Sequence, residues 1–156
     1  MSAPLELYVF VENRVGRKGV PIARSFERWA QAAADGRRHG LTQLNIVLFD
    51  AKAARALNKQ YRGKDYATNV LSFPYEAMAG DTSGLLGDIV MCPAVISREA
   101  REQGKNARDH YAHLTVHGVL HLLGHDHETG RDAVKMEAIE RRVLAGLGIS
   151  DPYVAR

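Results

Sequence analysis

Six of the chain's seven histidines fall between residues 110 and 127, and three of them have the spacing of metal ligands. His117 and His121 are four residues apart, so on a helix their imidazoles project from one face and can bind the same ion. Gly124 follows, and a glycine after the last helical turn readily adopts the left-handed conformation that reverses the chain. This reversal would bring His127 back toward the first two histidines. Three imidazoles with an open fourth position are typical of a catalytic zinc site.

Zinc is the expected ion, because the ligands are imidazoles, although nickel, cobalt and manganese also accept such ligands. His113 lies one turn before His117, where it is a group supporting the site, a substrate contact or a partly exposed polar residue. His110 and His125 are expected on the surface. Asp126 either orients a ligand imidazole or caps the next helix.

Gly118 distinguishes this pattern from the zinc peptidase motif H-E-x-x-H, in which a glutamate follows the first histidine and acts as general base. Glycine cannot accept or deliver the protons that peptide hydrolysis requires. A phosphodiester carries its charge on phosphate oxygens, so a metal ion and a cationic side chain can assist its cleavage. The residue therefore favours phosphodiester over peptide hydrolysis.

A second segment with potential chemistry, YRGKDYATNVLSFP, spans Tyr61–Pro74. Arg62 lies in an expected loop, where its guanidinium either contacts phosphate through paired donors or is simply solvated. Tyr61 and Tyr66 are candidates for stacking on RNA bases, with core packing as the alternative for Tyr61. Four basic residues either extend an RNA-binding strip or form an ordinary exposed helix face: Lys52, Arg55, Lys59 and Lys64.

The elements that must position these residues alternate irregularly between strands and helices. Hydrophobic periodicity predicts strands at 5–11, 43–49 and 86–91 and in the second half of 61–74, where Pro74 ends the strand. It predicts helices at 21–38, 51–60, 93–104, 107–123 and 131–147. Asp50 and Asn106 are expected N-caps, and Asp88 is assigned a turn or capping role, with support of the site as the alternative. The prediction is an α+β fold with a mixed, roughly four-stranded sheet packed with about five helices.

Composition indicates an ordinary globular protein. The 156 residues are 46% hydrophobic and 25% charged, with a net charge of +3, which suits a single domain over 1–156 and permits an anionic partner. The one cysteine, Cys92, excludes an intrachain disulfide and a cysteine-based zinc site. We find no signal peptide and no apolar run long enough to span a membrane, so a cytoplasmic location is expected.

Three segments together, Tyr61–Pro74, Leu86–Met91 (LGDIVM) and His113–His127 (HLTVHGVLHLLGHDH), closely resemble the bacterial endoribonuclease YbeY family in order and spacing. The resemblance runs from about residue 5 to residue 147. It implies a zinc-dependent, single-strand-specific endoribonuclease that acts in 3′-end maturation of 16S ribosomal RNA and in ribosome quality control. The implied partners are single-stranded RNA, ribosomal RNA and the small ribosomal subunit, without DNA or membrane.

The resemblance also assigns the site residues. The zinc ligands correspond to His117, His121 and His127, and the functional arginine corresponds to Arg62. We therefore expect one Zn²⁺ to polarise a water or an RNA phosphate oxygen while Arg62 holds the phosphate. Two other hypotheses are a metallopeptidase-like hydrolase and a non-catalytic ribosome-binding factor with a structural metal.

Overall fold

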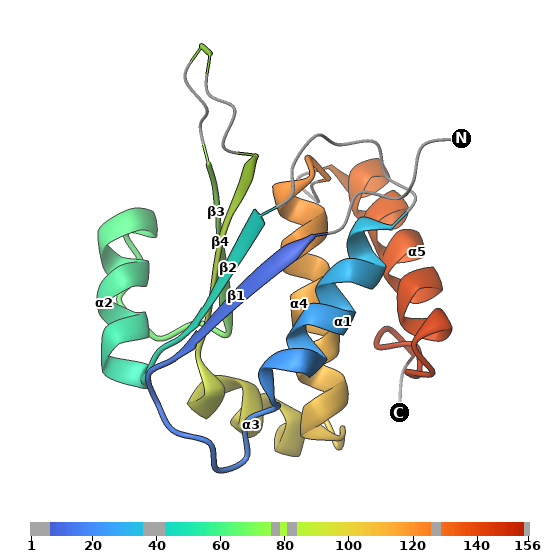
Figure 1. The fold of residues 1–156 in the computed structure, drawn as a ribbon. Helices are drawn as coiled ribbons and strands as arrows, with labels where there is room; N and C mark the ends of the chain where they lie inside the picture. Colours follow the sequence, from blue (N-terminus) through green and yellow to red (C-terminus); the bar gives the residue numbers. More distant parts are fainter. Residues whose placement is uncertain (1–6, 36–42, 76–78, 81–83, 126–128, 155–156) are drawn as a thin grey trace.

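The computed structural model describes residues 7–35, 43–75, 79–80, 84–125 and 129–154. Within these residues it has four strands and five helices, shown in Figure 1: β1 Tyr8–Asn13, α1 Ala23–Ala34, β2 Gln43–Leu48, α2 Ala51–Arg62, β3 Val70–Pro74, β4 Leu85–Met91, α3 Pro93–Glu102, α4 Ala107–Leu122 and α5 Gly130–Gly146. The predicted α+β class is confirmed. No helix in the described part of the chain is long and apolar enough to cross a membrane.

The four strands form one mixed sheet in the order β1-β2-β4-β3. β1, β2 and β4 run parallel, and β3 pairs with β4 in the antiparallel direction at the edge. Helices α1 and α4 lie against one face of the sheet, and α5 packs beyond them (Figure 1). Helix α2 lies on the opposite side, so this second face is less completely covered by helices.

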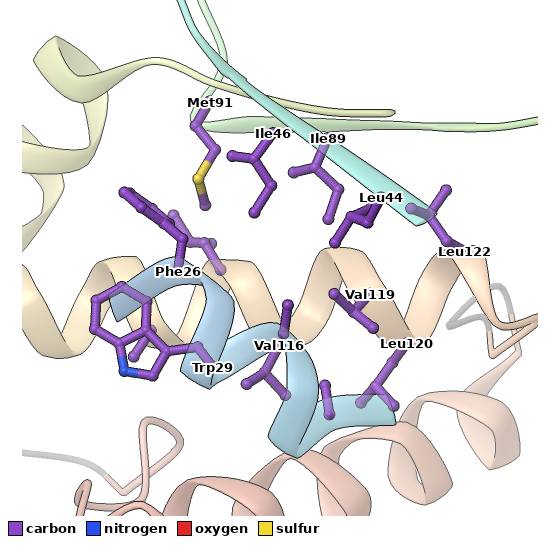
Figure 2. Close-up of a cluster of buried hydrophobic side chains, with 14 of the residues drawn as sticks. Phe26, Trp29, Leu44, Ile46, Ile89, Met91, Val116, Val119, Leu120 and Leu122 are labelled. Carbon is purple, nitrogen blue, oxygen red and sulfur yellow. The ribbon is translucent and has the colours of Figure 1, made fainter. Parts of the chain in front are cut away.

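The main core fills the space between the sheet and the helices α1 and α4 (Figure 2). Leu44, Ile46 and Ile89 project from the strands toward α4, where Val116 and Val119 face them. All five side chains are fully buried, and each contributes roughly 1.5–3 kcal/mol through loss of apolar surface to water. This packing fixes α4, the helix that carries the histidines, against the sheet.

The helix ends follow the predicted capping residues. The Asp50 carboxylate accepts a hydrogen bond from the backbone N–H of Ala53 at 2.8 Å. The side-chain oxygen of Asn106 caps α4 in the same way by accepting from the backbone N–H of Arg108. After α4, Gly124 adopts a left-handed φ of 99°. The backbone N–H of His125 then donates to the carbonyl of Leu120 at 3.0 Å, which is the bond expected for a glycine-terminated helix. The predicted left-handed conformation of Gly124 at the end of the helix is therefore confirmed.

Two apolar side chains near helix N-termini are exposed. Ile22 is 68% exposed because α1 begins one residue later and Ile22 is its N-cap. Val134 is 66% exposed because α5 packs through a stripe centred on the buried residues Met136, Glu140 and Leu144. The middle member of that stripe is a glutamate, and it lies next to the histidine helix.

Candidate active site

Three histidines, His113, His117 and His121, follow one another along one face of α4, each one helical turn from the next. The ring centroids of His113 and His117 are 6.2 Å apart, and those of His117 and His121 are 4.9 Å apart. The i, i+4 spacing thus brings the imidazoles into neighbouring positions, as expected for a helix. Because the core holds α4 in place, these rings project from a rigid support.

His117 and His121 line a cavity of about 800 Å³ at the edge of the sheet. Arg62, at the end of α2, lines the same cavity. The remaining walls come from Tyr61, residues 68–73 around β3, Gly124 and His125. Segments about 60 residues apart in the sequence therefore meet at one hollow that contains imidazoles and a guanidinium.

The third predicted ligand, His127, and its neighbour Asp126 lie outside the residues that the structure describes. The set of His117, His121 and His127 therefore stays a prediction. The described chain does bring the first two close together, and it reverses direction at Gly124, three residues before His127.

Glu140 of α5 connects two of these histidines, and no sequence motif pointed to it. Its carboxylate is fully buried and lies 2.6 Å from Nδ1 of His117 and 2.9 Å from Nε2 of His113. The Tyr153 hydroxyl donates a further hydrogen bond to Oε2 of Glu140. His113 is thus a supporting residue of this buried network rather than an exposed one.

The network determines the charge of Glu140. Burial alone would raise the pKa of this carboxyl group, but hydrogen bonds from His113, His117 and Tyr153 outweigh burial and lower its pKa to about 2. Burial, together with the neighbouring carboxylate, raises the pKa of Tyr153, which therefore stays protonated and acts as a donor. Glu140 is consequently a buried anion at neutral pH, surrounded by donors.

His113, His117 and Glu140 could also hold a metal ion, since one potential ligand atom from each lies within 4.8 Å of the others. However, the N–O distances of 2.6 and 2.9 Å are those of direct hydrogen bonds. If the Nδ1–H group of neutral His117 donates a hydrogen bond to Glu140, the lone pair of the ring is on Nε2. That tautomer suits metal binding through Nε2, with the carboxylate behind the ring.

The expectation that His110 lies on the surface was wrong. Its side chain is buried, and its Nε2 lies 3.0 Å from Oε1 of Glu99 on α3, because this side of α4 packs against α3. Burial lowers the pKa of His110, although Glu99 acts in the opposite direction. His125 is only partly exposed and lines the cavity, because the reversal at Gly124 directs the chain there.

Arg62 lies in the last turn of α2 rather than in the predicted loop, and Gly63 ends the helix with a left-handed φ of 70°. Cationic side chains are favourable at this end of a helix. Of the predicted basic strip, Arg55 forms an ion pair with Asp65 at 2.8 Å. Lys52, Lys59 and Lys64 are exposed.

The fold and the cavity together define a class of protein: an α+β candidate hydrolase, with histidines suited to metal binding on one wall and an arginine on another. Comparison with known proteins identifies the family. The model of the family described as Endoribonuclease YbeY matches residues 11–148. A protein named Endoribonuclease YbeY from Stenotrophomonas maltophilia (strain K279a) is 54% identical over 154 residues, covering 96% of this chain and 95% of the relative.

A relative of the same name from Alkalilimnicola ehrlichii is 56% identical over 140 residues, covering 88% of this chain and 84% of the relative. The chain therefore belongs to the endoribonuclease YbeY family, which confirms the resemblance and the predicted enzyme class. The solution structure of TM1509 from Thermotoga maritima is also similar in fold. Its TM-score is 0.57 at 24% identity, with 94% of this chain and 99% of that chain covered.

Proposed function

We propose that this chain is a zinc-dependent endoribonuclease that cleaves single-stranded RNA at the cavity lined by His117, His121 and Arg62. One Zn²⁺ would be held by His117, His121 and His127. The observation that carries the proposal is the shared cavity, in which two imidazoles one helical turn apart lie together with a guanidinium. Family membership supports RNA as the substrate.

The alternative ligand set of His113, His117 and Glu140 fits the distances less well. Zinc binds nitrogen at about 2.0–2.1 Å and carboxylate oxygen at about 2.0–2.2 Å, so its ligands are spread around the ion. Glu140 instead contacts both histidines directly, at 2.6 and 2.9 Å, and its Oε2 atom also accepts a hydrogen bond from Tyr153. We therefore assign Glu140 the role of orienting His117, with the Nδ1 proton held between them.

When bound, the ion would supply Lewis-acid chemistry to a phosphodiester. The protein's own part is to hold and orient the substrate. Arg62 is exposed at the cavity, and its paired N–H donors match two phosphate oxygens, so it would hold the phosphate as negative charge develops. Glu140 keeps the His117 ring in one tautomer and one orientation.

Gly118 argues against the peptidase hypothesis on structural grounds as well. A Cβ atom at this position would lie 2.9 Å from Cδ1 of Ile89 and 3.2 Å from Oγ of Ser72. The position therefore faces the sheet, and a glutamate there would have to enter the packed interface between α4 and the strands. Glycine permits this close approach, and it leaves the motif without the peptidase base.

In the cell, we propose that the substrate is ribosomal RNA and that the enzyme acts at the small ribosomal subunit in the cytoplasm, in 3′-end maturation of 16S rRNA and in ribosome quality control. The names of the relatives support an action on RNA. The net charge of +3 is compatible with an anionic substrate.

The test replaces His121 with alanine and uses His39→Ala, at the histidine outside the 110–127 cluster, as the matched control. Zinc content and cleavage of a labelled single-stranded RNA are measured, with the same RNA in a duplex alongside. We expect His121→Ala to lose bound zinc and cleavage, His39→Ala to retain both, and the duplex to resist. A His121→Ala protein with unchanged zinc content and activity would refute the proposal.

Chelation separates the other hypotheses. Our account expects the zinc-stripped protein to keep its circular dichroism spectrum and to stop cleaving RNA. Unfolding on chelation, with no cleavage by the loaded protein, would favour a ribosome-binding factor with a structural metal. Cleavage of casein but not of RNA by the loaded protein would favour a peptidase.

A further inference from the structure

A row of four residues crosses the sheet on the face opposite the main core. Phe10 of β1 is paired with Asn45 of β2, Asn45 with Asp88 of β4, and Asp88 with Phe73 of β3. Paired residues in a sheet project to the same side. The neighbouring residues Leu44, Ile46 and Ile89 point the other way, into the core (Figure 2). The expected turn or capping role of Asp88 was therefore wrong, because Asp88 lies within a strand.

This row lines a second cavity, of about 660 Å³, which α2 closes on one side with Leu57 and Tyr61. Cavities of roughly 300–1,000 Å³ are the usual size for small-ligand sites. Two polar residues lie at the centre of the row and one phenylalanine lies at each end. Phe10 is 54% exposed and Tyr61 is 60% exposed, so aromatic rings are accessible here.

The second cavity adjoins the candidate active site. Tyr61 and Phe73 line both cavities, and their rings meet edge to face with centroids 5.2 Å apart. A chain-like substrate that leaves the cavity of His117 and Arg62 around the edge strand β3 would therefore pass these two rings and reach the row. The two hollows suit successive nucleotides of one RNA strand.

From this geometry, and resting on the proposed function, we propose that the row is a nucleobase subsite for the RNA that flanks the cleaved bond. Phe10, Phe73 and Tyr61 supply faces for stacking, as aromatic side chains do in single-strand RNA recognition. The acidic side chains lining the cavity, Asp88 and Glu12, disfavour phosphates in it, so the bases enter and the backbone stays outside. Arg14, paired with Glu12 at 3.1 Å, provides a cation beside this cavity.

The polar centre of the row favours a particular base. Nδ2 of Asn45 donates to Oδ1 of Asp88 at 2.9 Å, which leaves Oδ2 of Asp88 and Oδ1 of Asn45 as acceptors. These acceptors match a base edge that carries adjacent N–H groups. Guanine presents an imino N–H and an amino group side by side, and a carboxylate can accept both. Uracil offers a single N–H on that edge, so guanine is the preferred occupant.

The experiment measures fluorescence anisotropy of two labelled nonamers, one of uridine only and one with a central guanosine. The His121→Ala background keeps the probes intact, and the wild-type protein is assayed separately for cleavage. We expect Phe10→Ala to weaken binding of both probes about 5- to 100-fold. Asp88→Asn should remove an approximately 5- to 100-fold preference for the guanosine probe. Ile22→Ala, which removes an exposed apolar side chain outside this cavity, should bind both probes like the background protein.

Unchanged affinity for both probes in Phe10→Ala and Asp88→Asn would overturn the subsite, even if the wild-type protein cleaves RNA. Binding of a lysine- and arginine-rich peptide that is lost in Asp88→Asn, with RNA binding unaffected, would overturn it in favour of a protein partner. Absence of RNA cleavage by the wild-type protein would instead count against the proposed function. The subsite is tested by the binding measurements alone, so the two failures can be distinguished.

Discussion

Glu140 shows how much one side chain contributes to this site. It is a fully buried carboxylate that holds His117 on one side and His113 on the other, and Tyr153 completes its hydrogen bonds. Carboxylates behind a metal-binding imidazole fix its tautomer and orientation and increase its basicity. The role of Glu140 can therefore be tested through metal affinity as well as activity.

Replacing Glu140 with glutamine should weaken zinc binding about 10- to 100-fold, because the neutral amide no longer fixes the proton on Nδ1 of His117. Affinity is measured by competition with a zinc indicator, and circular dichroism checks the fold. The control is Glu102→Gln, which makes the same chemical change at an exposed residue paired only loosely, at 3.8 Å, with Arg98. Equal zinc affinity in Glu140→Gln and the wild type would contradict the assigned role.

His110 makes the stability of the protein depend on pH. Burial lowers its folded-state pKa below the ordinary value of 6.5, so the unfolded chain binds a proton more readily than the folded one. The stabilising effect of neutral His110 is therefore fully present above pH 6.5 and is lost as the pH falls from 6.5 through the folded-state pKa. His110→Gln, which can still donate to Glu99, should flatten this part of the curve.

Urea denaturation of the zinc-stripped wild type and His110→Gln between pH 7.5 and 5 measures this effect. His39→Ala again serves as the matched control and should follow the wild type. Identical pH slopes for His110→Gln and the wild type over this range would show that His110 does not couple folding to protonation.

At the scale of elements, the close approach of α4 to the sheet is the decisive contact. Gly118 lets the helix lie so near β4 and β3 that a methyl group would reach 2.9 Å from Ile89. Ile89 is itself fully buried, so it has little room to move away. The same approach places His117, the preceding residue, at the wall of the cavity.

Gly118→Ala should therefore lower the free energy of unfolding by about 1–3 kcal/mol, although alanine favours helices more than glycine does. Thermal unfolding would record this as a decrease in Tm of several degrees. Gly130→Ala is the matched control, since nothing lies within 4 Å of its added Cβ atom, and its Tm should not fall. A Gly118→Ala protein as stable as Gly130→Ala would contradict the packing argument.

Features of single elements were predicted best. The caps at Asp50 and Asn106 and the left-handed conformation of Gly124 depend on residues adjacent in sequence, and the structure confirms them. The contact of Glu140 with His117 joins two helices across 23 positions and could not be predicted from local spacing. The available indication was a glutamate in an otherwise apolar stripe between Met136 and Leu144, which signals a buried partner.

At the scale of the whole molecule, the arrangement of layers explains the site. Helices α1 and α4 cover one face of the sheet with the core, and α5 packs behind α4 (Figure 1). Glu140 therefore approaches the histidine helix from α5, while Arg62 reaches the cavity from α2. Periodicity predicted the strands and helices, but it could not predict which edge of the sheet would bring Arg62 to the histidines, since that depends on strand order.

The position of the ion tests the central claim most directly. Crystals of the zinc-loaded protein, measured at the zinc absorption edge, would locate the metal by its anomalous signal. Our account predicts one ion on the cavity side of α4, about 2.0–2.1 Å from a ring nitrogen of each of His117 and His121. An ion between His113 and Glu140, or none near His121, would contradict it.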